Sequence, residues 1–312
     1  MQVIENHTKD VPIQPSSEVI WDERYALKTI TGERVDPDIP GMFDRVAAAL
    51  AGVEADTEYW RERFRWAMEN GATPAGRILS NAGAGEHKPA TTLINCTVSR
   101  TIRDSMRDIL EANTAAGMTL KAGAGIGYCF STLRPRGAIV AGAGASTNGP
   151  LAFMDIFDRT CETVSSAGGR RGAQMATIDV AHPDVEAFVT AKQEDGRFRK
   201  FNLSVLITDA FMEAVKEDKE WPLLFPLLPS EQDHIPPEQV LFREWEVHEP
   251  GYTVREDGLV ACRVYQTIRA RDLWNTIMRA NYDHAEPGFI LIDHVNRMNN
   301  NWFDEDIRAT NP

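Results

Sequence analysis

The sequence predicts an α/β fold in which strands alternate with helices around a largely parallel sheet, open or closed as a barrel, with a helical region before it. Short apolar runs such as residues 201–207 and 289–293 have the length of buried strands. Segments with apolar residues at helical spacing separate these runs, and glycine-rich turns join them. The 312 residues, 43% of them hydrophobic, suffice for one large domain or two ordinary ones.

The N-terminal part is expected to be helical. Residues 1–20 are polar, contain prolines and lack a hydrophobic period, which indicates a flexible arm, and we expect order to begin near Trp21. The residues that follow are the ordered N-terminal part. Its clearest helix covers residues 56–70, where Trp60 and Phe64 recur at helical spacing and are interpreted as core.

A second helix is predicted from about residue 104 to 121. Its expected buried face consists of Met106, Ile109, Leu110, Asn113 and Leu120. The glycine run at 123–127 then leads into a short buried strand at 128–130.

The remaining elements continue the alternation of strands and helices. Residues 221–258, rich in proline and charge, are interpreted as a surface excursion. The other expected elements are a helix opened by Pro150 that turns Phe153, Phe157 and Val164 inward, a helix opened by Pro183, the strand 201–207, helices from Asp209 and over 271–284, and the strand 289–293.

Composition excludes several classes of function. A formal net charge of −13 argues against a nucleic-acid-binding surface, which needs clustered Lys and Arg. No apolar run is long enough for a membrane span, and the first seven residues are too polar for a secretion signal, so we expect a cytoplasmic protein without a membrane partner. The widely spaced cysteines fit neither a disulfide scaffold nor a zinc site, and the seven histidines show no metal-ligand spacing.

Local motifs leave alternatives open when each is taken alone. The glycine run at 123–127 fits either a tightly packed turn or a nucleotide-binding loop. The turn at 168–172, with two adjacent arginines, fits either an anion site or a solvated turn. Cys96 is either a buried small hydrophobe, the commoner case, or an accessible thiol.

Taken together, the motifs resemble one family. From about residue 20 to the last residue, their types and order are similar to those of ribonucleotide reductase large chains, with the character of the adenosylcobalamin-dependent class (class II). The motifs are the segments 76–83, 95–96, 103–105, 123–137, 149–150, 168–172, 182–184, 201–205, 287–288 and 309–312.

The resemblance implies a fold. The family fold is a ten-stranded α/β barrel of two parallel five-stranded halves, with a finger loop that threads the centre and carries the radical cysteine. Residues 21–85 are similar to the family's helical N-terminal region, and residues 86–312 are similar to the first half of that barrel, with effector-binding loops and the start of the finger loop. In the family, Asn-Pro is followed by Cys-Gly-Glu, so the resemblance implies that the radical cysteine and the base carboxylate follow Pro312 and that the fragment is inactive alone. An intein at this position, a split chain or a truncation would each account for this.

The resemblance also implies a reaction. A thiyl radical, formed through homolysis of the cobalt–carbon bond of adenosylcobalamin, removes the 3′ hydrogen of a ribonucleotide, the 2′ hydroxyl leaves as water, and two thiols become a disulfide. Cys96 matches the first reducing thiol, and its partner is expected beyond residue 312. Asn311 matches the amide that hydrogen-bonds the ribose, and Ser80, Asn95 and Gly125 fall in substrate-binding segments.

Other motifs resemble the family's regulatory site for a deoxynucleoside triphosphate effector. Asp104 and Ser105 match the positions that recognise the nucleoside, and Arg134 matches a phosphate contact. The segment 168–175 matches a loop between effector and substrate that could couple them, with Arg171 as the side chain that transmits the effect.

The remaining cysteines and one histidine receive structural interpretations. Cys129 on a presumed strand and Cys161 on a helix are expected to pack in the core, whereas the role of Cys262 stays undecided. His182, which precedes Pro183, is interpreted as a residue at a helix start.

Two alternatives and several partners complete the expectations. The chain could act alone as a deoxynucleotide-binding regulatory fragment, or belong to the large chain of a di-iron (class I) reductase. The expected partners are the C-terminal remainder of the reductase, a thioredoxin-type reductant and a second copy in a homodimer, with no nucleic acid. The choice between diphosphate and triphosphate substrates stays open.

Overall fold

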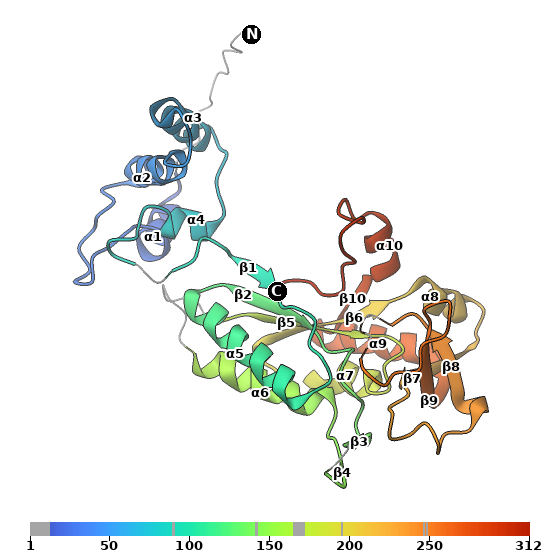
Figure 1. The fold of residues 1–312 in the computed structure, drawn as a ribbon. Coiled ribbons are helices and arrows are strands. Elements are labelled where there is room, and N and C mark those ends of the chain that lie inside the picture. Colours follow the sequence, from blue (N-terminus) through green and yellow to red (C-terminus); the bar gives the residue numbers. More distant parts are fainter. Residues whose placement is uncertain are drawn as a thin grey trace. The chain divides into compact units, whose positions relative to one another are not determined.

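The computed structural model describes the chain as two compact units (Figure 1). One unit contains the chain up to Asn95 together with Ala122–Ala124, and the other contains most of the chain from Cys96 onward. The description covers residues 13–88, 91–140, 143–164, 172–194, 196–245, 247 and 249–312.

The first unit is helical. Its elements are α1 (Pro15–Arg24), α2 (Ile39–Ala51), α3 (Thr57–Glu69) and α4 (Gly76–Asn81). Helix α1 begins at a proline in its first turn, where the missing N–H costs no hydrogen bond, and thus earlier than the expected start of order near Trp21. Helix α3 begins where predicted, because the Asp56 carboxylate accepts a hydrogen bond from the backbone N–H of Tyr59.

The interpretation of Trp60 as a core residue is wrong. Its side chain is 39% exposed, and Met68 is the buried residue of α3. Phe64 is partly buried and packs on the core of this unit. Helix α3 packs on α2, and the Trp60 ring lies edge-on to Tyr59 and tilted against Phe64.

The second unit contains a five-stranded sheet in which all neighbouring strands are parallel, in the order β1-β2-β5-β6-β10. This confirms the predicted α/β fold with a parallel sheet. The strands are β1 (Cys96–Val98), β2 (Gly125–Cys129), β5 (Gln174–Asp179), β6 (Phe201–Ile207) and β10 (Gly288–Leu291). Strand β10 is shorter than predicted, because Ile292 already begins helix α10 (Ile292–Arg297).

One face of this sheet is buried under helices. The covering helices are α5 (Met106–Ala122), α6 (Pro150–Thr163), α7 (Val185–Thr190), α8 (Asp209–Lys216) and α9 (Ala270–His284). In β2, Ile126 and Tyr128 point into this core. Since side chains alternate along a strand, Gly125, Gly127 and Cys129 lie on the opposite face.

Helices α5 and α6 differ in how well their buried faces were predicted. In α6, Phe157 is fully buried and Phe153 packs against the same core, as predicted. In α5, Met106 and Leu110 are 58% and 46% exposed, so their assignment to the buried face is wrong. The residues of α5 that are buried are Ile109, Ala112, Ala116 and Leu120. Small alanines let α5 pack closely, and that rotates the larger side chains outward.

The segment 221–258 is only in part the surface excursion that was predicted, because its first residues are buried while most described residues after 228 are exposed or half-buried. It contributes to an antiparallel sheet of β7 (Glu220–Pro226), β9 (Val260–Arg269) and β8 (Val240–Arg243), in the order β7-β9-β8. Leu223 is buried in the main core, and Phe225 and Leu224 are buried in two smaller hydrophobic clusters.

The smaller elements are a hairpin of β3 (Ile139–Val140) and β4 (Ala145–Ser146) and two short 3-10 helices, Ala191–Gln193 and Pro237–Gln239. Within the described ranges, no helix combines the length and the apolar character that crossing a membrane would require.

Candidate active site

The glycine-lined face of β2 is the centre of the candidate site. Cys96 in β1 is the register partner of Gly125 in β2. A Cβ built on Gly125 would lie 3.3 Å from the Cys96 Sγ and 2.8 Å from the Pro312 Cγ. The site therefore needs glycine at position 125, because the half-buried thiol and the C-terminal segment both approach its backbone.

The segment Thr310–Pro312 crosses the same face two residues further along β2. A Cβ on Gly127 would overlap the carbonyl oxygen of Thr310 and would lie 3.2 Å from the Asn311 Cα. Three residues before this segment, Ile307 is tied to helix α10 by two hydrogen bonds, in which the Asn296 side chain donates to and accepts from the Ile307 backbone (3.0 and 2.7 Å). The structure thus brings Cys96 and Asn311 to one face of the sheet, with the Asn311 side chain exposed.

Two cavities open at the carboxyl ends of the parallel strands, where α/β sheets commonly bind ligands. One, of 840 Å³, lies between the end of β1 and residues 302–311. The other, of 630 Å³, lies over the ends of β2, β5 and β6. Cys129 lines both cavities, so the face that carries Cys96 continues into a polar hollow.

The second cavity contains an ion pair that the sequence patterns did not predict. Arg243 binds Asp179 with an Nη2 to Oδ2 distance of 3.0 Å, and the charge of Asp179 raises the pKa of the guanidinium. The backbone N–H of Asp179 and the Cys129 thiol both donate to the Ser131 hydroxyl. Asp179 ends an apolar strand, which is a readable signal, whereas Arg243 belongs to β8, which the sequence did not predict.

Asp104 and Arg134, both predicted to bind an effector, form an ion pair. The Arg134 Nε donates to the Asp104 Oδ2 at 2.7 Å, the Arg134 backbone N–H donates to Oδ1 at 3.1 Å, and Nη1 donates to the Ile139 carbonyl at 2.7 Å. Burial raises the pKa of the Asp104 carboxyl, and the Arg134 charge offsets part of that rise. The guanidinium is therefore held in one orientation while remaining partly accessible.

Ser105 and Arg171, the other two residues predicted for effector binding, are not part of this ion pair. The Ser105 hydroxyl accepts a hydrogen bond from the backbone N–H of Asp108, so it caps the start of α5. Arg171, with the predicted coupling loop up to that residue, lies outside the described residues.

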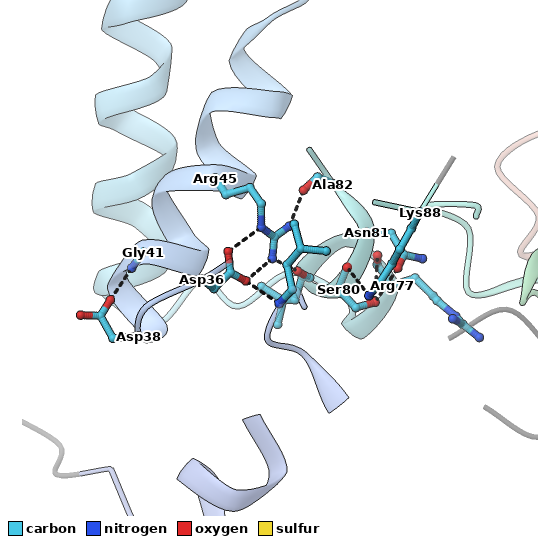
Figure 2. Close-up of polar contacts among 11 residues, drawn as sticks. Asp36, Asp38, Gly41, Arg45, Arg77, Ser80, Asn81, Ala82 and Lys88 are labelled. Atoms are coloured by element: carbon cyan, nitrogen blue, oxygen red, sulfur yellow. Dashed lines mark hydrogen bonds and ion pairs between the residues drawn. The ribbon is translucent and has the colours of Figure 1, made fainter. Parts of the chain in front are cut away.

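Ser80 and Asn95 belong to the helical unit. Ser80 is buried at the end of α4, and its hydroxyl donates to the Asn81 Oδ1 at 3.1 Å (Figure 2). Asn95 is half-buried and directly precedes Cys96.

The other three cysteines are buried, and His182 lies just before a helix. Cys129 and Cys161 are buried, as predicted, and so is Cys262, whose role the sequence left open. Burial raises the pKa of Cys161 to about 11 and that of Cys262 to about 12. His182 accepts the backbone N–H of Asp184 at Nδ1 and contacts the Leu133 carbonyl through Nε2, just before α7, which agrees with a residue at a helix start.

Comparisons with known proteins match both parts of the chain to the same family. A family model described as "Ribonucleotide reductase, barrel domain" matches residues 94–312, and one described as "Ribonucleotide reductase, all-alpha domain" matches residues 14–87. A vitamin B12-dependent ribonucleoside-diphosphate reductase of Mycobacterium tuberculosis (strain ATCC 25618 / H37Rv) is 32% identical over 297 residues, which cover 93% of this chain and 36% of the relative.

Two more distant relatives also match most of this chain and about a third of their own length. The vitamin B12-dependent ribonucleoside-diphosphate reductase of Thermoplasma acidophilum is 28% identical over 279 residues, 89% of this chain and 31% of the relative. The ribonucleoside-diphosphate reductase large subunit of Vaccinia virus is 27% identical over 265 residues, 83% of this chain and 32% of the relative. The chain spans about a third of the length of these curated relatives.

Proposed function

Because the chain belongs to the ribonucleotide reductase family, we propose that it forms the N-terminal part of a catalytic chain that reduces ribonucleotides to deoxyribonucleotides. The approach of Cys96 and the segment Thr310–Pro312 to the glycine-lined face of β2 carries this proposal. A C-terminal remainder supplies the rest of the barrel, since the relatives are about three times as long.

In this proposal Cys96 is one of two reducing thiols. Each substrate molecule loses its 2′ hydroxyl as water and gains a hydrogen at that carbon, while two thiols give up two hydrogens and form a disulfide. Asn311 binds the ribose hydroxyls through its amide, and Gly125, which has no side chain, lets the thiol and the segment that carries Asn311 approach the same stretch of backbone.

The second reducing thiol comes from the C-terminal remainder. Cys129 lies four residues along β2 from the register partner of Cys96, which is about 13 Å along a strand. That separation is too large for a disulfide, which needs Cα atoms within about 7 Å. Cys161 and Cys262 are buried away from solvent, so neither can exchange with an external reductant of the thioredoxin type.

For the radical source, we propose adenosylcobalamin, because two of the compared relatives are named vitamin B12-dependent. When bound, this cofactor supplies a carbon-centred radical. Among the residues that the structure describes, no group of three or more His, Cys, Asp or Glu side chains could hold a metal ion. We therefore assign no residue of this chain to the cofactor.

For regulation, we propose that Asp104, Ser105 and Arg134 bind a deoxynucleoside triphosphate, with Arg171 coupling that site to the substrate. The Asp104 carboxylate holds the Arg134 guanidinium ready for a phosphate, which removes part of the ordering cost of binding. Calorimetry with the four deoxynucleoside triphosphates should detect binding that Arg134→Ala weakens. Arg255→Ala, which removes an exposed arginine paired with Asp257, is the control. Equal binding by wild type and Arg134→Ala would contradict this assignment.

Turnover of the chain joined to its C-terminal remainder tests the reaction. With adenosylcobalamin, a dithiol reductant and no second subunit, the joined enzyme should reduce ribonucleotides, and Cys96→Ser should abolish that activity while effector binding persists. Cys161→Ser, at a buried thiol without a proposed role, is the control and should retain turnover. Wild-type turnover by Cys96→Ser would refute the role of this thiol, and a requirement for a second subunit would refute the class assignment.

A further inference from the structure

Helix α10 holds the part of the chain that leads to Asn311. The Asn296 side chain of this helix pairs with the Ile307 backbone, since its Nδ2 donates to the Ile307 carbonyl oxygen at 3.0 Å and its Oδ1 accepts the Ile307 N–H at 2.7 Å. One side-chain amide thus binds both backbone groups of a single residue, as a residue of a neighbouring antiparallel strand does. From Ile307 the chain returns to the sheet and ends beside β1 (Figure 1).

Helix α10 is itself anchored to α8. The Asp293 Oδ2 accepts a hydrogen bond at 2.7 Å from the backbone N–H of Asp209, the first residue of α8. Arg297 forms an ion pair with the Asp209 carboxylate. Both side chains come from the same short helix as Asn296, which therefore starts from a fixed position when it binds Ile307.

Beyond Ile307, packing holds the segment against the sheet. In the described part of the chain, the backbone groups of Ala309, Thr310 and Asn311 take part in no hydrogen bond. Ile307 and Ala309 pack on the small buried cluster that contains Cys129. Apolar packing depends on buried area and is not directional, so by itself it does not distinguish one register of the segment from the next. The amide of α10 makes that distinction, because it binds the N–H and the C=O of one particular residue.

We propose that Asn296 is a positioning residue, which fixes the register of residues 307–312 on the sheet and thereby places Asn311 at the ribose. The link to the ribose rests on the proposed reductase function, whereas the fixed register does not. Packing of the alternate residues Ile307 and Ala309 in one cluster is typical of an extended segment. In such a segment, a slip of one residue moves each side chain by about 3.3 Å and turns it to the opposite face. Asn311 would then no longer lie beside Cys96.

Site-resolved labelling of Cys96 with iodoacetamide tests the register without turnover. In folded chains with a cooperative unfolding transition, Asn296→Leu should accelerate the labelling about 5- to 100-fold, the effect of losing two hydrogen bonds that keep Pro312 close to the thiol. Asn296→Asp keeps the size of the side chain and its acceptor, but it turns a carboxylate oxygen toward the Ile307 carbonyl oxygen. It should therefore behave like Asn296→Leu, whereas a role in packing alone would leave its labelling at the wild-type rate.

Asn299 provides the matched control. Its side chain also donates to a backbone carbonyl, that of Glu305 at 2.8 Å, and accepts a backbone N–H, that of Asn301 at 2.9 Å, but both partners precede the segment 307–312. Asn299→Leu should leave Cys96 labelling unchanged. Equal labelling of wild type and Asn296→Leu, or equal acceleration by the two leucine variants, would overturn the positioning role.

Kinetics of the chain joined to its C-terminal remainder test the link to the substrate. Asn296→Leu should raise the KM for the ribonucleotide, by at most the factor found in labelling, and keep most of kcat, because bound substrate selects the competent register. Loss of folded enzyme would instead lower kcat at an unchanged KM, and that result would overturn the link. Accelerated labelling with both constants unchanged would overturn it as well. An inactive wild-type joined enzyme would refute the reductase proposal, while the labelling rates would still decide the register.

Discussion

Replacing Gly127 by alanine should detach the C-terminal segment from the sheet. A Cβ at this position would overlap the Thr310 carbonyl oxygen and would lie 2.8 Å from its carbonyl carbon. Carbon atoms in contact are ordinarily about 3.5–4.0 Å apart, so the segment must move by roughly 1 Å or more. Because the obstacle is backbone on both sides, rotation of a side chain cannot relieve the clash.

The energetic cost should fall on the segment rather than on the sheet. Overpacking of this kind costs about 1–3 kcal/mol, and residues 310–312 can move away without breaking a strand pairing of β2. We therefore expect Gly127→Ala to keep a cooperative unfolding transition. Movement of Pro312 away from Gly125 should uncover the Cys96 thiol.

Two assays report the displacement. Site-resolved alkylation followed by mass spectrometry should show faster modification of Cys96 in Gly127→Ala. The joined enzyme should also lose turnover, because the substitution displaces Asn311, the residue proposed to bind the ribose. Gly117→Ala is the control. Its added Cβ would meet only Thr160 Cγ2 at 3.5 Å in the middle of α5, where alanine stabilises a helix by about 0.5–1 kcal/mol relative to glycine. Unchanged Cys96 alkylation and full turnover in Gly127→Ala would refute the proposed contact.

Three further predictions follow from burial. Iodoacetamide at pH 8 should modify half-buried Cys96 well before buried Cys161, since a thiol with a pKa of about 11 is about one part in a thousand thiolate at that pH, and comparable rates would contradict the burial pattern. Phe157→Ala should lower the free energy of unfolding by about 3–5 kcal/mol in urea titrations, whereas Trp60→Ala should lower it by less than about 1 kcal/mol; equal losses would contradict the assigned positions. Burial lowers the pKa of His182 below its usual 6.5, so the contribution of the neutral form to stability is complete above about pH 6.5 and is lost as the pH falls toward the lower folded-state pKa. Between pH 7.5 and 5, the free energy of unfolding of His182→Gln should therefore fall less than that of the wild type. Parallel curves of unfolding free energy against pH would exclude this linkage.

Local signals in the sequence were sufficient for the individual helices and strands of the α/β fold. Helix α3 begins and ends as predicted, because its Asp56 cap and Gly71 are local signals. Strand β6 matches the predicted range 201–207 because a buried parallel strand is apolar along most of its length. The order of the motifs along the chain was also enough to identify the family.

Burial was predicted less well where packing partners decide it. Trp60 and Leu110 are apolar and occur at helical spacing, yet both are exposed because other side chains of the same helices face the core. The charge and proline content of residues 221–258 favoured a surface segment, but β7 is stabilised by pairing with β9, which lies more than thirty residues later. Hydrophobic period shows which face of an element is apolar, not what that face will meet.

The sequence by itself determined the alternation of strands and helices, the family, and the residue types available for chemistry. Only the tertiary structure decided that the segment Thr310–Pro312 lies on the glycines of β2 beside Cys96, and that Asp104 holds Arg134. These contacts join residues that are distant in the sequence or in different elements. Strand order and helix packing create them, and no local pattern contains that information.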